Sequence, residues 1–411
     1  MNYNIINILI FFDYNKFKHK LYKGDYMKKI RIYGIILLLL LTVCSGIMQN
    51  KCFAYAEENF DLTAKSAILM DYNSGTIIYE KDKDKKLPIA SMVKMMTIYI
   101  TFQKLESGYI KYEQEFTSSE NVSKMGGSQV FMDPYVNYTV KDLLKSVIMA
   151  SANDASVALA EGISGSEGEF VKLMNDTAKT LGMNNTYYVN STGLPAPEQY
   201  SCAYDCAILL KNILKYDDYH KFSTIWMDSL THPSGRKTEL VNTNKLIRYY
   251  NGCDSGKTGS TGEAGYCLTS SAVRNNMRLI SVVIGAKTGK DRFKESTSIL
   301  NYGFANFENK QLVNKVNVLK ELSTKKCKND IAEIIPVEDF FAFDKKGSSS
   351  NYNVTVELPE SIGATKVGEI VGRVIISKEG NVIKIIGLTV KNDVEGLSFI
   401  DNVKNIIANM Y

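Results

Sequence analysis

Two short, mainly apolar stretches rich in strand-forming residues lie early in the chain, at 66–70 and 76–79. A polar, glycine-containing segment separates them, and this arrangement predicts a β-hairpin. From about 91 to 215 the apolar residues instead recur every three or four positions, which predicts a series of helices. Two later apolar runs, at 266–273 and 278–285, are typical of buried strands.

One more helical pattern, at 294–304, follows these strands. The pattern therefore predicts a domain of the mixed α/β (α+β) class. We expect an antiparallel sheet whose strands come from both ends of the domain sequence, with helices between and around them.

The composition changes after about residue 308, where short alternating runs appear at 315–319, 352–356, 373–376 and 382–386. Turn-forming residues separate these runs, so they predict a small antiparallel β domain. The last segment, 397–411, returns to a helical pattern with its apolar residues on one face. Its few basic residues argue against strong membrane attachment, so it contacts a membrane surface weakly, packs on its own domain or frays.

The amino-terminal segment has the three parts of a secretory signal peptide. Lys28, Lys29 and Arg31 form a basic region, Ile35 to Leu41 form an apolar core, and the stretch from Ala54 to Ala56 is a cleavage site of the Ala-x-Ala type. This leader predicts export to an extracytoplasmic location. A complete leader begins at Met27, so either Met1 or an internal Met27 is the start.

These patterns divide the chain into four segments. They are a leader at 1–56 with the signal peptide at 27–56, a first domain at 57–308, a β-rich domain at 309–392, and an amphipathic tail at 393–411.

Net charge and cysteine content exclude several classes of function. The 411 residues hold 49 Lys and Arg against 44 Asp and Glu, but the leader accounts for 8 of the former and 2 of the latter. The remaining 41 and 42 leave a net charge of −1, so no basic surface indicates nucleic-acid binding. The five cysteines after the leader are an odd, scattered set and do not form a disulfide framework.

Ser91 and Lys94 are the first candidates for chemistry. They lie three residues apart at the start of a helical pattern, so their side chains share one helix face. A serine hydroxyl becomes a good nucleophile when a neighbouring base takes its proton. A lysine serves as that base when burial or nearby positive charge lowers its pKa.

Two further patches of candidate catalytic residues follow along the chain. Ser151 and Asn153 form a Ser-x-Asn pattern, and Lys257 opens a Lys-Thr-Gly pattern before a glycine-rich strand. Together with Ser-x-x-Lys, they make the motif set of penicillin-recognising serine acyl enzymes. A second Lys-Thr-Gly begins at Lys287, but it lies in the turn after a buried strand, so we assign the motif to Lys257.

The sequence offers little support for catalysis by a histidine or by a metal ion. Only His220 and His232 follow the leader, and both lie in polar stretches where we expect solvated loop histidines rather than members of a Ser-His-Asp triad. No His-x-x-x-His or Cys-x-x-Cys pattern occurs. We therefore expect neither a metal nor a cofactor.

With these motifs, the chain resembles the serine-type D-alanyl-D-alanine carboxypeptidases, the low-molecular-mass penicillin-binding proteins. Segments around Met174, Leu181, Asn242 and Tyr266 also match that family. The resemblance covers roughly 60–390. It implies a penicillin-binding, β-lactamase-like transpeptidase domain with an antiparallel sheet and helices, followed by a small all-β domain.

The resemblance also implies a role for each candidate residue. Ser91 would form the acyl-enzyme, Lys94 would accept its proton, and Ser151 would pass a proton to the leaving D-alanine. The implied substrate-binding residues are Asn153, Lys257, Thr258, Gly259, Ser260 and Arg292. Among these, the N–H groups of Ser91 and Ser260 would form the oxyanion hole, and Thr258 and Arg292 would engage the substrate carboxylate. The chain departs from the family at Ser260, where some members have histidine, and at Ser255, where a bulkier residue is common; these departures leave the substrate preference open but not the chemistry.

The implied activity is removal of the terminal D-alanine from peptidoglycan stem peptides during cell-wall synthesis, with β-lactam antibiotics as covalent inhibitors. Two alternatives remain. One is a class A-like β-lactamase, which needs a glutamate to activate the deacylating water, but no Glu-x-x-Leu-Asn pattern is present. The other is an inactive module that only binds peptidoglycan, which the intact Ser91 and Lys94 argue against.

Overall fold

The computed structural model describes residues 60–398 and Ile400. The expected leader at 1–56, with its two alternative start positions, lies outside the described residues, as does most of the expected tail at 393–411. Within the described part of the chain, no helix is both long enough and apolar enough to cross a membrane.

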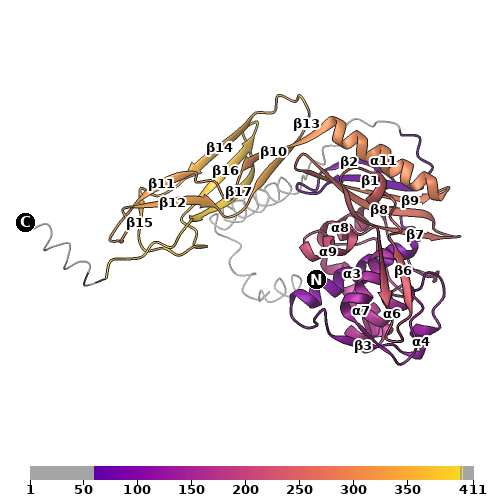
Figure 1. Ribbon diagram of the computed structural model, residues 1–411. Helices are drawn as coiled ribbons and strands as arrows, with labels where there is room; N and C mark the ends of the chain where they lie inside the picture. Colours follow the sequence, from indigo (N-terminus) through magenta and orange to yellow (C-terminus); the bar gives the residue numbers. More distant parts are fainter. Residues whose placement is uncertain (1–59, 399, 401–411) are drawn as a thin grey trace, which may run out of the picture. The chain divides into compact units, whose positions relative to one another are not determined.

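The first domain is built on a five-stranded antiparallel sheet with the order β2-β1-β9-β8-β7. Its strands are β1 (Ser66–Asp71), β2 (Ile77–Lys81), β7 (Cys253–Thr261), β8 (Gly265–Arg274) and β9 (Met277–Ala286). The predicted hairpin and the two predicted buried strands are confirmed. Because β1 pairs with β9, segments from the two ends of the domain lie side by side at the centre of the sheet (Figure 1).

Helices cover both faces of this sheet. The helical elements are η2 (Ala90–Val93), α3 (Lys94–Glu106), α4 (Glu120–Ser123), α5 (Val140–Met149), α6 (Asn153–Ser164), α7 (Glu167–Thr180), α8 (Ala203–Ile213), α9 (Asp217–Ser223), α10 (Leu246–Tyr249) and α11 (Gly289–Asn306). Alternate residues of β1 enter different cores, since Ile68 packs with the large helical cluster and Leu69 packs with α11. The predicted helix at 294–304 is confirmed, although α11 begins earlier.

Two small hairpins lie among the helices. One pairs β3 (Glu115–Thr117) with β4 (Asn137–Thr139), inside a stretch where the sequence indicates only helices, and the other pairs β5 (Met227–Thr231) with β6 (Lys237–Val241).

The second hairpin overturns the expectation of two solvated histidines. His232 is 1% exposed, and its ring nitrogens lie 2.9 Å from the Tyr138 hydroxyl and 2.9 Å from the Thr238 hydroxyl. His220 lies on α9, half-buried, with Nδ1 3.6 Å from a carboxylate oxygen of Asp254. The expectation is wrong because both polar stretches fold against other elements, which their local composition does not reveal.

The β-rich region forms a six-stranded sheet of order β14-β16-β17-β12-β11-β15 and a separate pair, β10 with β13. The strands are β10 (Phe307–Val313), β11 (Lys320–Thr324), β12 (Ile331–Pro336), β13 (Phe340–Lys345), β14 (Tyr352–Glu357), β15 (Ser361–Ile362), β16 (Gly372–Lys378) and β17 (Asn381–Val390). Three of the four predicted runs are strands. The sheet is not wholly antiparallel, because β11 and β15 pair in parallel.

The run at 315–319 is not a strand. The Asn314 side chain accepts a hydrogen bond from the N–H of Val316, its carbonyl accepts one from Asn317, and the Lys315 N–H donates to Asp339. Asparagine readily makes such local hydrogen bonds, which here close a turn in place of a strand.

Candidate active site

Ser91 lies in the single turn of η2, directly before α3, as the sequence predicts for a serine at a helix start. The preceding residue, Ala90, has a φ of +48°, in the left-handed region that a residue with a side chain rarely adopts. Gly193 packs against this turn so closely that a Cβ there would lie 2.0 Å from the Ala90 carbonyl oxygen. The surrounding chain therefore holds the turn in a strained conformation, which is typical of functional sites.

Lys94 is fully buried, and its Nζ lies 3.1 Å from the Ser91 Oγ. The same amine donates a hydrogen bond to the carbonyl oxygen of Thr192. Burial, reinforced by the charge of Lys257, holds the pKa of Lys94 well below its usual value, and Asp154 offsets only part of this shift. The amine is thus favoured in its neutral form, in which it accepts a proton from a hydroxyl.

Ser151 and Lys257 form the second half of the site. Ser151 is 4% exposed, has a φ of +61°, and lies just before α6. The Lys257 Nζ donates to the Ser151 Oγ at 2.6 Å and to the Thr258 carbonyl oxygen at 3.0 Å. Burial lowers the pKa of Lys257 to about 7, with a smaller contribution from the positive charge of Arg292.

The strand β7 lies directly against the nucleophile turn. Side chains alternate along a strand, so Lys257 and position 259 share the face toward the helices, and Thr258 and Ser260 share the other. At Gly259 a Cβ would lie 2.5 Å from the Ile89 carbonyl oxygen and 3.1 Å from the Ser91 nitrogen. Only glycine allows this approach of β7 to Ser91.

Asn153 presents an unpaired acceptor to the site. Its backbone N–H donates to the Ser128 carbonyl at 2.7 Å, and its Nδ2 donates to the Gly126 carbonyl at 2.6 Å. Within the described part of the protein, its buried Oδ1 has no hydrogen-bond partner. A buried acceptor without a partner is costly, and a ligand N–H would satisfy it.

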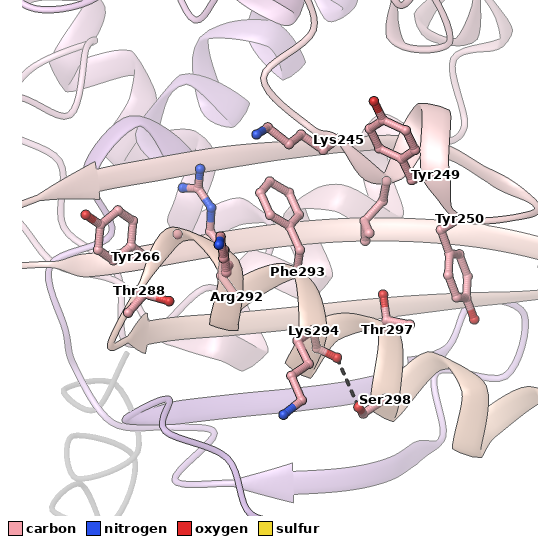
Figure 2. A pocket seen from close by; sticks show the side chains of 13 residues that line it. Lys245, Tyr249, Tyr250, Tyr266, Thr288, Arg292, Phe293, Lys294, Thr297 and Ser298 are labelled. Atoms are coloured by element: carbon pink, nitrogen blue, oxygen red, sulfur yellow. Dashed lines mark hydrogen bonds between the residues drawn. The ribbon is translucent and has the colours of Figure 1, made fainter.

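Arg292 reaches this strand from the first turns of α11. Its Nη1 donates to the Gly259 carbonyl at 3.1 Å and, at 3.4 Å, to that of Cys267. The guanidinium carbon lies 5.6 Å from the ring centroid of Tyr266 and 4.9 Å from that of Phe293 (Figure 2). Arg292 thus adds a second positive charge beside β7, near enough to lower the pKa of Lys257.

Two direct hydrogen bonds join Ser91 to Lys94 and Ser151 to Lys257, and the charge of Lys257 acts on Lys94. Gly259 packs against the turn of Ser91, and Arg292 donates to the Gly259 carbonyl. Thr258 is 5% exposed, while Ser260 is exposed. No hydrogen bond links any of the first four side chains to a carboxylate among the described residues.

Three supporting residues escape the sequence analysis. The Asp154 carboxylate accepts hydrogen bonds from the N–H groups of Val130 and Met132, and so ties their loop to α6. The Tyr219 hydroxyl accepts from the Gly256 N–H at 3.3 Å, just before Lys257. Asp154 could have been found from the sequence, because it directly follows the Ser-x-Asn motif. The third residue is Thr192, whose carbonyl oxygen accepts a hydrogen bond from Lys94. No sequence pattern identifies Thr192 or Tyr219.

The second Lys-Thr-Gly lies elsewhere. Lys287 is exposed, and the Thr288 side chain accepts a hydrogen bond from the Asp291 N–H at 3.1 Å, which caps α11. Among the residues that the structure describes, no cluster of His, Cys, Asp and Glu is arranged to hold a metal ion. The five cysteines after the leader are free and buried.

Each of the two domains matches a known protein family. Residues 53–288 match the family described as "D-alanyl-D-alanine carboxypeptidase", and residues 307–396 match "Penicillin-binding protein 5, C-terminal domain". The D-alanyl-D-alanine carboxypeptidase DacF of Bacillus subtilis (strain 168) is 40% identical over 347 residues, which cover 84% of this chain and 89% of that protein. DacA of Haemophilus influenzae is 36% identical over 341 residues, 81% of this chain and 86% of that protein.

Solved structures show the same similarity. Penicillin binding protein 5 from Haemophilus influenzae has a TM-score of 0.65 and 34% identity, covering 83% of this chain and all of that chain. Penicillin-binding protein D2 from Listeria monocytogenes, in its ampicillin-bound form, has a TM-score of 0.54 and 29% identity, covering 60% of this chain and all of that chain.

Proposed function

Because the chain belongs to the D-alanyl-D-alanine carboxypeptidase family and is a serine-type D-Ala-D-Ala carboxypeptidase, we propose that Ser91 carries its acyl group and that Lys94 is the base. The observation that carries this assignment is the pair of hydrogen bonds from Lys94 to Ser91 and from Lys257 to Ser151. The comparisons do not favour the β-lactamase alternative, and no glutamate is hydrogen-bonded to these residues in the described structure.

The first step is acylation. The Ser91 Oγ–H passes its proton to the neutral Lys94 Nζ at 3.1 Å, and the oxygen attacks the carbonyl carbon of the penultimate D-alanine. The carbonyl oxygen becomes an oxyanion that accepts hydrogen bonds from the backbone N–H groups of Ser91 and Ser260. The strained turn at Ala90 keeps the Ser91 N–H in place before substrate arrives.

The second step releases the terminal D-alanine. The C–N bond breaks, and the leaving nitrogen takes a proton from the Ser151 hydroxyl. Lys257 holds the Ser151 oxygen at 2.6 Å, and the Lys94 ammonium returns to Ser151 the proton that it took from Ser91, so Lys94 is neutral again. Water then attacks the ester carbonyl, with Lys94 as the general base, and frees Ser91 and a stem peptide one residue shorter.

Two features of the site select the substrate: the positive charge beside β7 and the unpaired oxygen of Asn153. The terminal carboxylate of the substrate pairs with Lys257, Thr258 and Arg292, since charge-assisted hydrogen bonds to a carboxylate are the strong ones. The unpaired Oδ1 of Asn153 accepts an N–H of the peptide backbone. A peptide that lacks a free carboxyl end therefore loses the contacts of the positive side of the site.

A β-lactam uses the same site. Ser91 attacks the carbonyl of the four-membered ring, and the leaving nitrogen stays attached to the acyl group, which blocks the approach of water. We also propose that the protein acts outside the cytoplasmic membrane, where peptidoglycan stem peptides are found, after removal of a leader within 1–56. Weak membrane contact through the tail at 393–411 belongs to this proposal.

Release of D-alanine from diacetylated Lys-D-Ala-D-Ala tests the proposal. We expect the full chain to release one D-alanine per peptide, and we expect no release by a Ser91→Ala variant that retains its unfolding temperature. A folded Ser91→Ala variant with normal release would refute the assignment of the nucleophile. A wild-type chain that binds the peptide without cleaving it would instead identify an inactive binding module.

A further inference from the structure

A large cavity lies on the face of the sheet that carries α11, near β7, the catalytic strand that carries Lys257. Its volume is about 890 Å³, and its lining comes from α10, β8 and the first turns of α11. The lining excludes Ser91, Lys94, Ser151 and Lys257, so the cavity is separate from the nucleophile. Cavities of this size accept a ligand or a peptide end.

The lining of this cavity is positively charged. Lys245, Lys290 and Arg292 contribute cations, and no Asp or Glu is among the described lining residues. No salt bridge joins these three side chains to a carboxylate elsewhere in the described structure. The Arg292 Nε is buried and has no hydrogen-bond partner there. The cavity thus offers unpaired positive charge to an anion.

Figure 2 shows how these groups lie. The Arg292 guanidinium and the Lys245 amine extend toward the same space, whereas the Lys294 amine points away from both. Tyr249, at 71% exposure, and Tyr266, at 38%, add aromatic surface around this space. Two residues of the second Lys-Thr-Gly motif, Thr288 and Gly289, also line this cavity.

Arg292 connects the cavity to the catalytic strand. It lines the cavity and donates hydrogen bonds to the carbonyl of Gly259 on β7. Tyr266, also in the lining, pairs with Ser260 on the same strand. A polymer whose one stem peptide lies along β7 therefore meets a second cationic site beside that strand.

We propose that this cavity binds the carboxylate end of a second stem peptide of the same peptidoglycan chain. The proposal rests on the proposed function, because it takes the stem peptide as substrate. A stem end carries a carboxylate, which Lys245 and Lys290 neutralise while Arg292 holds the stem that lies on β7, and small apolar groups, which Tyr249 and Tyr266 contact. Binding two stems of one polymer makes the second contact intramolecular, so the enzyme remains longer on multi-stem substrate than on a single peptide.

The test compares D-alanine release per stem from the single-stem tripeptide and from soluble, uncross-linked peptidoglycan chains. We expect the wild-type chain to show a KM per stem at least about tenfold lower on the polymer. The Lys245→Gln/Lys290→Gln variant should lose this preference and keep wild-type kinetics on the tripeptide. Lys111→Gln/Lys237→Gln removes two exposed lysines of the same domain and should keep the preference.

Two results would overturn the inference. One is an equal KM per stem for wild-type enzyme on both substrates, and the other is an equal loss of preference in both double variants, which would indicate bulk charge alone. Failure of the wild-type chain to release D-alanine from the tripeptide would refute the proposed function instead. The tripeptide assay also reports whether each variant has folded.

Discussion

A single methyl group at position 259 should slow acylation strongly. In Gly259→Ala the new Cβ would lie 2.5 Å from the Ile89 carbonyl oxygen, where ordinary contact begins at 3.4 Å. The same carbon would lie 3.1 Å from the nitrogens of Ser91 and Met92. The strand β7 or the nucleophile turn must therefore shift by about 0.9 Å, the difference between the two distances.

Such a shift separates Lys257 and the N–H of Ser260 from Ser91. A misplacement of about 1 Å costs roughly 10²-fold in rate, or about 2.7 kcal/mol. We expect Gly259→Ala to react with a fluorescent penicillin about 10²-fold more slowly than wild type in stopped-flow measurements. Overpacking should also lower the free energy of unfolding by about 1–3 kcal/mol, measured by urea unfolding.

Gly262→Ala is the matched control, because nothing lies within 4 Å of a Cβ at that position. It should acylate at the wild-type rate. The reasoning fails if folded Gly259→Ala acylates at a near-native rate, or if Gly262→Ala is slowed as much.

Three further predictions concern the charged residues. Acylation should slow as pH falls through the lowered pKa of Lys94, because protonation removes the base, and Lys94→Arg should acylate no faster than Lys94→Ala in a penicillin assay. Lys257→Ala should lower activity by roughly 10²-fold or more and, since the charge of Lys257 lowers the pKa of Lys94, should move the acid limb of the pH–rate profile to higher pH, whereas Lys287→Ala should do neither. Asp154→Asn should lower the free energy of unfolding by about 1–3 kcal/mol, because an amide cannot accept all the N–H donors of the carboxylate; an unchanged urea midpoint would contradict this.

The sequence predicted those parts of the site that depend on short spacing. Ser91 and Lys94 are three residues apart, so a helical pattern alone places their side chains on one face. The choice of Lys257 over Lys287 depended on local context, and the hydrogen bond from Lys257 to Ser151 agrees with that choice. The alternating runs that became β14, β16 and β17 were likewise local signals.

Long-range contacts escaped prediction. The carbonyl of Thr192 contacts Lys94 across 98 positions of sequence, and a backbone carbonyl has no residue type that identifies it. The burial of His232 depends on Tyr138, which is 94 positions away. The left-handed conformation of Ala90 is imposed by packing, since alanine has no preference for it.

The central claim is that Ser91 is the residue acylated during turnover. Mass spectrometry of the protein after treatment with a penicillin and digestion measures this directly. We predict one adduct, on the peptide that contains Ser91, and no adduct in a folded Ser91→Ala variant. An adduct on any other serine of the wild-type chain would contradict the account.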